Sequence, residues 1–147
     1  MALASDAVVD DVSVLDVWKR LESDTTAQLV DVRTRPEWAF VGVPDVSKLG
    51  RRVLMIEWQT FPDSRVDPGF QDRLKGLLVE AGVKNDADLF FICRTGGRSR
   101  MAAEAMAAAG YVRCHNVTEG FEGPLDADRH RGKLAGWKSA GLPWVQG

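Results

Sequence analysis

The sequence contains few of the residues that hold metals or form covalent cross-links. Among its 147 residues are only two cysteines and two histidines. Cys93 and Cys114 are too few for a disulfide framework and lack a zinc-ligand spacing, so both are expected to be free thiols. His115 and His130 have no further ligand types arranged around them. We therefore expect no metal site and no cofactor.

Long apolar runs and a strong charge imbalance are also absent. No segment approaches the roughly 18 apolar residues of a membrane span, and the first residues, MALASDAVVDDVS, have acids where a secretion signal has bases. The formal net charge of -2 gives no overall attraction to nucleic acid or to an anionic membrane. The expectation is a cytoplasmic protein with neither as a partner.

The chain is long enough to enclose one ordinary hydrophobic core. Its 147 residues are 45% hydrophobic, which is typical of a globular domain. We expect a single domain over residues 1–147. Its core should cover about residues 10–125, with a glycine-rich tail from residue 126 packing on it.

Helical and extended segments alternate along the chain. Cap residues and apolar spacing predict helices over 13–22, from 34 onward through Trp38, over 70–81 and over 99–109, with a short helix near 133–139. Apolar runs predict strands over 28–32, 52–58, 88–92 and 111–117. Strands joined through helices by right-handed crossovers form a layered α/β structure. The predicted fold is a doubly wound sheet of mainly parallel strands with helices on both faces.

One of these strands ends in a cysteine. The segment DLFFI at 88–92 has no polar alternation, which is typical of a strand buried on both faces of a parallel sheet. Cys93 follows at its carboxyl end. In open parallel sheets ligands bind at that edge, so Cys93 is the leading candidate for a functional residue.

The loop after Cys93 favours a reactive thiolate. Gly96 and Gly97 can both adopt positive φ, which lets backbone N–H groups converge into an anion-binding nest. The helix expected to begin near Ser99 directs its positive end at the same point, and Arg94 and Arg98 add positive charge. The plainer alternatives are a buried structural cysteine and a glycine-rich turn with solvent-facing arginines.

The segment Cys93-Arg-Thr-Gly-Gly-Arg98-Ser99 resembles the active-site loop of the rhodanese, or thiosulfate sulfurtransferase, family. The segment Asp31–Arg33 with Glu37-Trp38 resembles the first conserved box of that family, and Glu119–Phe121 with Gly123 resembles the last. The resemblance implies a rhodanese-like domain in which Cys93 accepts a sulfane sulfur, becomes a persulfide and passes the sulfur to a nucleophilic acceptor.

The resemblance also implies roles for the neighbours of Cys93. Backbone N–H groups from Arg94 through Thr95, Gly96, Gly97 and Arg98 to Ser99 would hold the persulfide. The arginines would attract a small anionic sulfur donor such as thiosulfate, and the Ser99 hydroxyl could donate a hydrogen bond. The acceptor would be a thiol or a protein.

Two features of the front half bear on the match. Asp31 is an acid in an apolar strand, so we expect a buried carboxylate paired with an arginine or with loop amides, supporting the site together with Arg33. Many family members carry Gly-His-Ile-Pro-Gly-Ala before the second strand, whereas residues 41–46 read VGVPDV. The histidine of that stretch is absent here.

Other functions remain open from the sequence. Cysteine phosphatases of the same fold use a loop one residue longer, with an arginine six positions after the cysteine, where this chain has Ser99. The shorter spacing to Arg98 favours sulfur transfer. A persulfide-carrying or regulatory interaction module is a further alternative. Cys114 is expected to be a buried thiol, the alternative being a resolving role towards Cys93.

Overall fold

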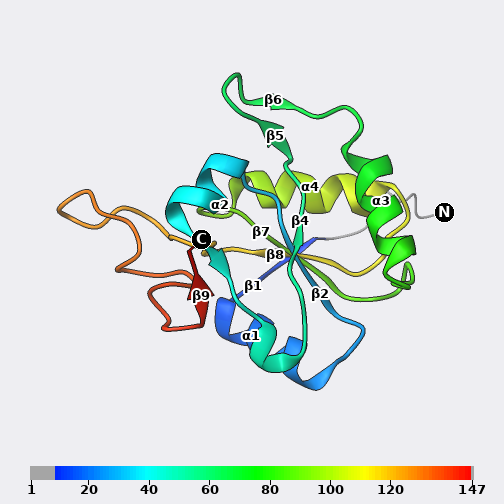
Figure 1. The fold of residues 1–147 in the computed structure, drawn as a ribbon, viewed down its shortest axis with the longest axis horizontal. Helices are drawn as coiled ribbons and strands as arrows, with labels where there is room; N and C mark the ends of the chain where they lie inside the picture. The colour runs from blue at the N-terminus through cyan, green and yellow to red at the C-terminus, as the bar shows by residue number, and fades with distance from the viewer. Residues whose placement is uncertain (1–8, 147) are drawn as a thin grey trace.

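A five-stranded parallel sheet forms the centre of the protein. The computed structural model describes residues 9–146. The strands are Asp10–Val12 (β1), Gln28–Asp31 (β2), Leu54–Met55 (β4), Leu89–Ile92 (β7) and Cys114–Val117 (β8), in the order β1-β8-β7-β2-β4 (Figure 1). Every neighbouring pair is parallel. This arrangement confirms the predicted parallel sheet.

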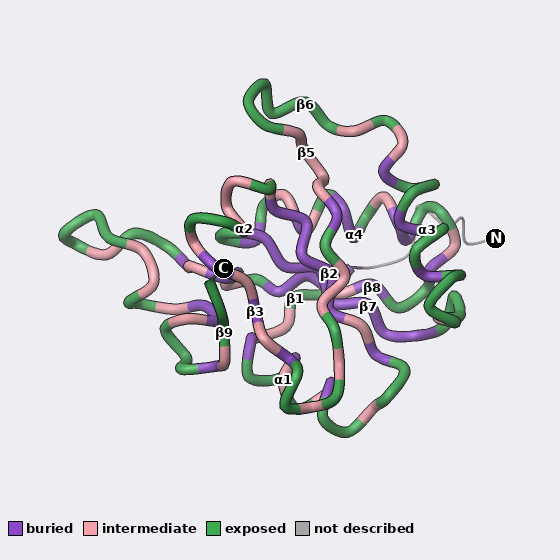
Figure 2. The backbone as a smooth tube through the Cα atoms, in the orientation of Figure 1, coloured by how far each residue is buried: buried purple, intermediate pink, exposed green. Residues whose placement is uncertain are grey.

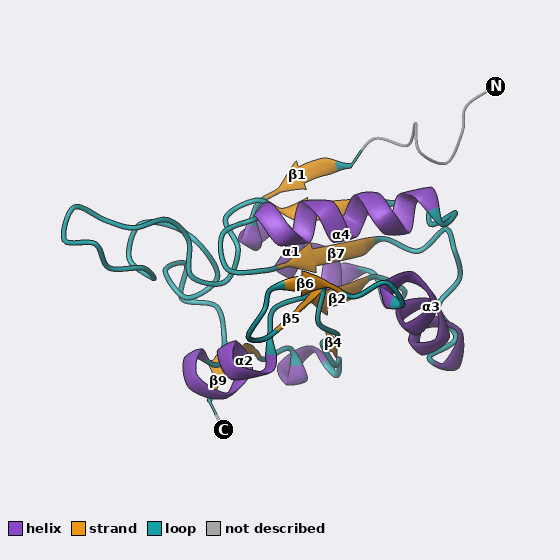
Figure 3. Cartoon of the chain, turned by 90° about the horizontal axis from the view of Figure 1, so that it is seen from above, coloured by secondary structure: helices purple, strands orange, loops and turns teal. Residues whose placement is uncertain are grey.

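Helices cover both faces of this sheet, as the sequence predicted. Helix α1 (Val14–Ser23) lies on one face, and α3 (Phe70–Glu80) and α4 (Gly97–Ala108) lie on the other (Figures 1 and 3). The four residues of β7 are buried; Leu89 and Phe91 pack with α3 and α4, while Phe90 and Ile92 pack with α1. The buried strands run through the middle of Figure 2.

The remaining elements are short. They are α2 (Arg35–Val41), a 3₁₀ helix η2 (Ser47–Leu49), an antiparallel pair of β3 (Val43–Pro44) with β9 (Trp144–Val145), and a hairpin of β5 (Gln59–Thr60) with β6 (Arg65–Val66). The predicted cap of α1 is confirmed, because the Ser13 hydroxyl accepts the Asp16 N–H at 3.1 Å. Among the described residues no helix is long and apolar enough to cross a membrane.

Several predicted boundaries differ from the structure. The strand expected over 52–58 is reduced to β4, although the N–H groups of Ile56 and Trp58 still bond to the carbonyls of Asp31 and Val32. The strand expected from residue 111 begins at Cys114. The short edge strand β1 was not predicted, because two of its three residues are aspartates and the segment has no apolar pattern.

The helix expected near residues 133–139 is absent. Those residues form bends and turns. Gly136 has φ +104°, whereas an α-helix needs φ near -63°. Its backbone also lies so close to the 120–123 segment that an added Cβ would meet the Gly123 nitrogen at 2.9 Å. Tertiary contact, which periodicity does not reveal, therefore decides the conformation of this segment.

The tail contributes one large side chain to the core. Trp137 is fully buried and belongs to the same apolar cluster as Val17 and Leu21 of α1. Its ring meets Trp18 edge to face at 6.0 Å, and its indole N–H donates to the Pro143 carbonyl at 2.7 Å. This side chain fixes the tail against the α1 face of the sheet.

Replacing Trp137 should therefore destabilise the whole domain. We expect Trp137→Ala to lower the free energy of unfolding by about 3–5 kcal/mol, since it removes a buried aromatic ring and leaves a cavity. Trp144→Ala, at a tryptophan that is 40% exposed, is the matched control and should cost much less. Urea unfolding measures both; equal losses would contradict the assigned role of Trp137.

Candidate active site

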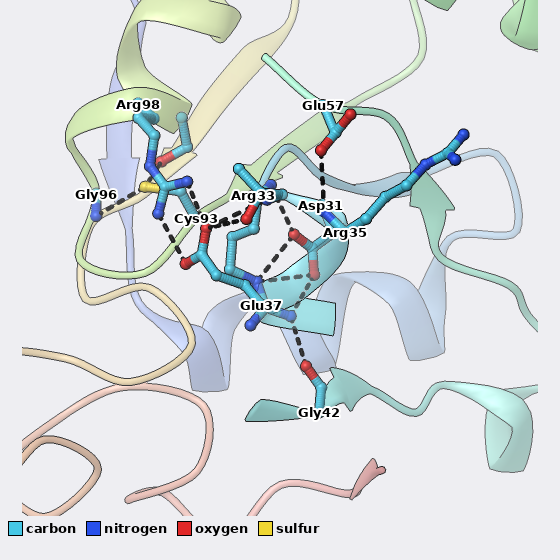
Figure 4. Close-up of polar contacts among 11 residues, drawn as sticks. Asp31, Arg33, Arg35, Glu37, Gly42, Glu57, Cys93, Gly96 and Arg98 are labelled. Atoms are coloured by element: carbon cyan, nitrogen blue, oxygen red, sulfur yellow. Dashed lines mark hydrogen bonds and ion pairs between the residues drawn. The ribbon is translucent and has the colours of Figure 1, made fainter. Parts of the chain in front are cut away.

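Cys93 lies at the carboxyl end of β7, the central strand of the sheet. Cys93 is only 1% exposed. The sulfur Sγ accepts a hydrogen bond from the Gly96 N–H at 3.1 Å (Figure 4). It also lies 3.2 Å from the Ser99 hydroxyl. Two hydrogen-bond donors thus converge on one buried sulfur atom.

The backbone conformation of the loop requires glycine at position 96 but not at position 97. Gly96 is the N-cap of α4, with φ +108°, and a Cβ there would lie 2.4 Å from the Thr118 carbonyl oxygen. Positive φ is therefore confirmed for Gly96. The expectation was wrong for Gly97, which is the first residue of α4 and has open space around it. The helix also begins two residues earlier than expected, which brings its positive end closer to Cys93.

The Ser99 hydroxyl belongs to a chain of hydrogen bonds that the sequence did not reveal. It lies 2.6 Å from Asn116 Oδ1, and the Asn116 amide donates to the Asp11 carboxylate at 3.0 Å. The hydroxyl has one hydrogen, so it donates either to Asn116 or to the Cys93 sulfur. Because the Asp11 carboxylate accepts from the amide nitrogen, Asn116 presents its oxygen to Ser99.

Arg98 forms an ion pair within the site. Its guanidinium donates two hydrogen bonds to Glu37, at 2.6 and 2.9 Å (Figure 4). Burial raises the pKa of Glu37, but the hydrogen bonds and charge of Arg98, together with Thr34, outweigh it and lower that pKa to about 2. The positive charge that the sequence assigned to an anionic donor is therefore balanced by a carboxylate.

Asp31 and Arg33 form a second ion pair, which is fully buried. Arg33 Nη2 lies 2.7 Å from the Asp31 carboxylate and 2.8 Å from the Gly42 carbonyl (Figure 4). The Arg33 guanidinium also lies 4.3 Å from the centre of the Phe121 ring. The structure confirms that Asp31 is buried and paired with an arginine, and it shows that this pair joins the end of β2 to α2 and the tail.

Backbone hydrogen bonds join residues 120–123, which lie just before the tail, to the active loop. The Phe121 N–H donates to the Cys93 carbonyl at 2.8 Å, and the N–H groups of Glu122 and Gly123 both donate to the Arg94 carbonyl at 3.1 Å. Gly120 is packed against the same loop, since a Cβ there would meet the Arg94 carbonyl oxygen at 2.3 Å. The loop conformation thus depends on a segment about 25 residues further along the chain.

A cavity of about 490 Å³ lies against the loop on its solvent side. Its lining comes from α2, the β5–β6 hairpin, the active loop and the tail: Thr34, Pro36, Glu37, Val41, Gln59, Phe61, Ser64, Arg94, Arg98, Glu122 and Arg131. Arg94 and Thr95 are exposed. The sequence did not predict Arg131 as a site residue, because nothing in the pattern around a single arginine in a glycine-rich tail indicates where it lies in the fold.

The second cysteine lies outside this arrangement. Cys114 is 3% exposed in β8, and burial raises the pKa of its thiol to about 12. Its sulfur lies 3.2 Å from the Tyr111 carbonyl oxygen. These properties are those of an unreactive buried thiol.

Comparisons with known proteins agree with the fold. The family model of the STR4 middle domain matches residues 10–147. RC0915 of Rickettsia conorii is 35% identical over 136 residues, covering 92% of this chain and 97% of the relative. The chloroplastic rhodanese-like domain-containing protein 4 of Arabidopsis thaliana is 27% identical over 134 residues, which are 91% of this chain and 25% of that protein.

Two solved structures extend the comparison. Rv0390 from M. tuberculosis shares 43% sequence identity with a TM-score of 0.84, covering 95% of this chain and 98% of that one. The polysulfide-sulfur transferase homodimer from Wolinella succinogenes shares 22% identity with a TM-score of 0.60, covering 98% of this chain and 83% of that one, which is a likeness of fold.

The fold and the cysteine loop define a rhodanese-like domain. Within that class, the chain belongs to the family of the STR4 middle domain.

The Glu37–Arg98 pair should make stability depend on acid pH. The folded pKa of Glu37, about 2, lies below its ordinary value of 4.5, so its carboxylate contributes stability above pH 4.5 that is lost as the pH falls towards 2. We expect Glu37→Gln to lower the free energy of unfolding by about 1–3 kcal/mol at pH 7 and to flatten the loss between pH 4.5 and 2. Glu104→Gln, at an exposed position, is the control. If the free energy of unfolding, measured in urea, falls equally between pH 4.5 and 2 in the wild type and in Glu37→Gln, the pairing is contradicted.

The packing of Gly120 against the loop can be separated from its backbone conformation. Gly120 and Gly82 have nearly the same φ, +73° and +75°, but only Gly120 has neighbours where a Cβ would stand. Both substitutions to alanine should cost about 1 kcal/mol from the left-handed backbone. We expect Gly120→Ala to cost at least 2 kcal/mol more, roughly the price of overpacking. Equal free energies of unfolding for Gly120→Ala and Gly82→Ala would contradict the close packing and show that the loop moves to accommodate a Cβ.

Proposed function

We propose that the protein is a sulfurtransferase, in which Cys93 takes a sulfane sulfur from thiosulfate or a persulfide and passes it to a thiophilic acceptor. The observation that carries this proposal is the position of the Cys93 sulfur. It lies at the carboxyl edge of a parallel sheet, receives the Gly96 N–H and faces the Ser99 hydroxyl at the start of α4. Such surroundings stabilise a sulfur anion.

The chemistry requires only a nucleophilic sulfur and a leaving group. The Cys93 thiolate attacks the outer sulfur of thiosulfate, so that a new S–S bond forms while the original one breaks, and sulfite leaves with the electron pair. In the second step an acceptor such as cyanide or a thiolate attacks the outer sulfur of the Cys93 persulfide, and the Cys93 thiolate leaves. No external oxidant or reductant is consumed.

The first turn of α4 supports the persulfide stage. The first backbone bond at the start of the helix runs from the Arg100 N–H to the Gly96 carbonyl at 3.3 Å, so the N–H groups before it are not used in helical hydrogen bonding. They point towards the end of the helix where the outer sulfur anion would form. The Ser99 hydroxyl can turn from Asn116 to the sulfur when negative charge develops there.

A phosphatase is supported less well than a sulfurtransferase. Phosphate binding in a cysteine loop needs an arginine whose guanidinium is free to clasp two oxygens. Arg98 donates to both oxygens of Glu37 instead. A persulfide carrier that delivers only to a dedicated protein shares the first chemical step, so the fate of the bound sulfur separates it from an enzyme with small-molecule acceptors.

The proposal predicts a stable sulfur adduct on one cysteine. Reduced protein incubated with thiosulfate and freed of small molecules should gain the mass of one sulfur atom at Cys93, because the surrounding N–H groups stabilise the persulfide. Intact-protein and peptide mass spectrometry measure the gain. Cyanide should remove the sulfur and release thiocyanate.

Two cysteine variants serve as controls. Cys93→Ser should abolish the adduct, and Cys114→Ser should retain it, since the Cys114 thiol is buried away from the loop. If neither thiosulfate nor a protein persulfide adds sulfur to Cys93, the proposal is wrong. Loss of the adduct in both variants would point to a disulfide mechanism in its place.

A further inference from the structure

We infer that Arg131 of the tail, together with Arg94 of the active loop, binds the anionic sulfur donor and so sets the preference of the site for dianions such as thiosulfate. This inference rests on the proposed sulfurtransferase function. It assigns to Arg94 and Arg131 the role that the family resemblance implied for Arg94 and Arg98.

The charges around the cavity leave these two arginines for a ligand. Three arginines and two glutamates line the cavity, and Glu37 is occupied by both nitrogens of Arg98. Within residues 9–146, no carboxylate lies within 4.0 Å of a guanidinium nitrogen of Arg94 or Arg131. Two guanidinium groups therefore face the cavity without a balancing partner.

The remaining acid of the cavity, Glu122, has another cation nearby. Burial lowers the pKa of Lys138, and the negative charge of Glu122 opposes that shift. Lys138 is held over the Trp144 ring at 4.0 Å. Glu122 thus reduces the positive potential of the cavity without forming an ion pair with Arg131.

Arg131 is held in position by the same segment that shapes the loop. Its Nη1 donates to the Gly123 carbonyl at 3.0 Å, and the Gly123 N–H in turn donates to the Arg94 carbonyl at 3.1 Å. One further backbone bond, from Gly132 to Glu122, closes the turn that carries the side chain. The guanidinium is therefore oriented by the chain before any ligand arrives, while its other N–H groups remain available.

Arginine in this geometry suits a small oxyanion. A planar guanidinium presents paired N–H donors that match two oxygens of a sulfonate or sulfite group. Arg94 and Arg131 would hold the sulfonate end of thiosulfate in the cavity beside the loop that begins at Cys93. A neutral sulfur donor gains nothing from either arginine.

Steady-state kinetics of sulfur transfer to cyanide tests the inference. Arg131→Gln should raise KM for thiosulfate by roughly 3–10-fold, because one of two cationic contacts is lost, with little change in kcat. Arg131→Lys keeps the positive charge but lacks the paired N–H donors, so it should restore the affinity in part. Lys133→Gln removes the same charge from an exposed position in the same tail and should leave KM unchanged. Glu122→Gln should act in the opposite direction and lower KM.

Alkylation of Cys93 gives a second measurement that does not require sulfur transfer. Iodoacetate and iodoacetamide have nearly the same shape, but only the first is an anion. The ratio of their rates at Cys93, read by peptide mass spectrometry, should fall about 3–10-fold in Arg131→Gln and stay at the wild-type value in Lys133→Gln. Unfolding in urea establishes that each variant is folded.

The outcomes separate this inference from the proposed function. If thiosulfate loads Cys93 but KM and the alkylation ratio of Arg131→Gln match those of Lys133→Gln, the role of Arg131 is refuted and sulfur transfer stands. If no donor loads Cys93 while the alkylation ratio falls, sulfur transfer is refuted and Arg131 retains its role in attracting anions. A fall in Arg131→Gln that Arg131→Lys does not reverse even in part would mean that the side chain acts through structure, which overturns the inference that its charge attracts the anion.

Discussion

The buried ion pair of Asp31 and Arg33 is the constraint on which the carboxyl edge of the sheet depends. Neither side chain is exposed, and a lone charge in such surroundings would cost several kcal/mol. Arg33 contacts the end of β2, the Gly42 carbonyl after α2 and the face of Phe121, while its Nη1 is buried without a hydrogen-bond partner. The need to solvate one guanidinium thus gathers three parts of the chain around the loop that carries Cys93.

A second ion pair, between Glu37 and Arg98, fixes another part of the site. Glu37 accepts the N–H and hydroxyl of Thr34 at the start of α2 and also accepts two hydrogen bonds from Arg98. The same carboxylate therefore begins a helix and fixes the first turn of another. Arg98 is held by this ion pair, so among the described arginines that line the cavity Arg94 and Arg131 are those without a carboxylate partner.

The chain of Asp11, Asn116 and Ser99 adds a polar connection behind the sulfur. It runs from the edge strand β1 through β8 to the first turn of α4, and Arg100 binds Asp11 at its outer end. Asn116 and Ser99 are both buried, so each polar atom in the chain needs a partner. A hydroxyl with two acceptors and one hydrogen can change its donor direction without any movement of the backbone, which suits a sulfur atom that gains and loses charge.

Sequence by itself determined the parallel sheet, the helices on its two faces and the position of Cys93, because apolar runs, caps and glycines act over a few residues and leave a readable pattern. It also indicated a buried Asp31. It did not reveal β1, the course of residues 133–139, the partner of Arg98 or the place of Arg131. Each of these depends on groups far apart in the chain, such as Glu37 beside Arg98 or Gly136 against Gly123. Only the tertiary structure brings such groups together, so it alone decides which charges are paired and which remain open to a ligand.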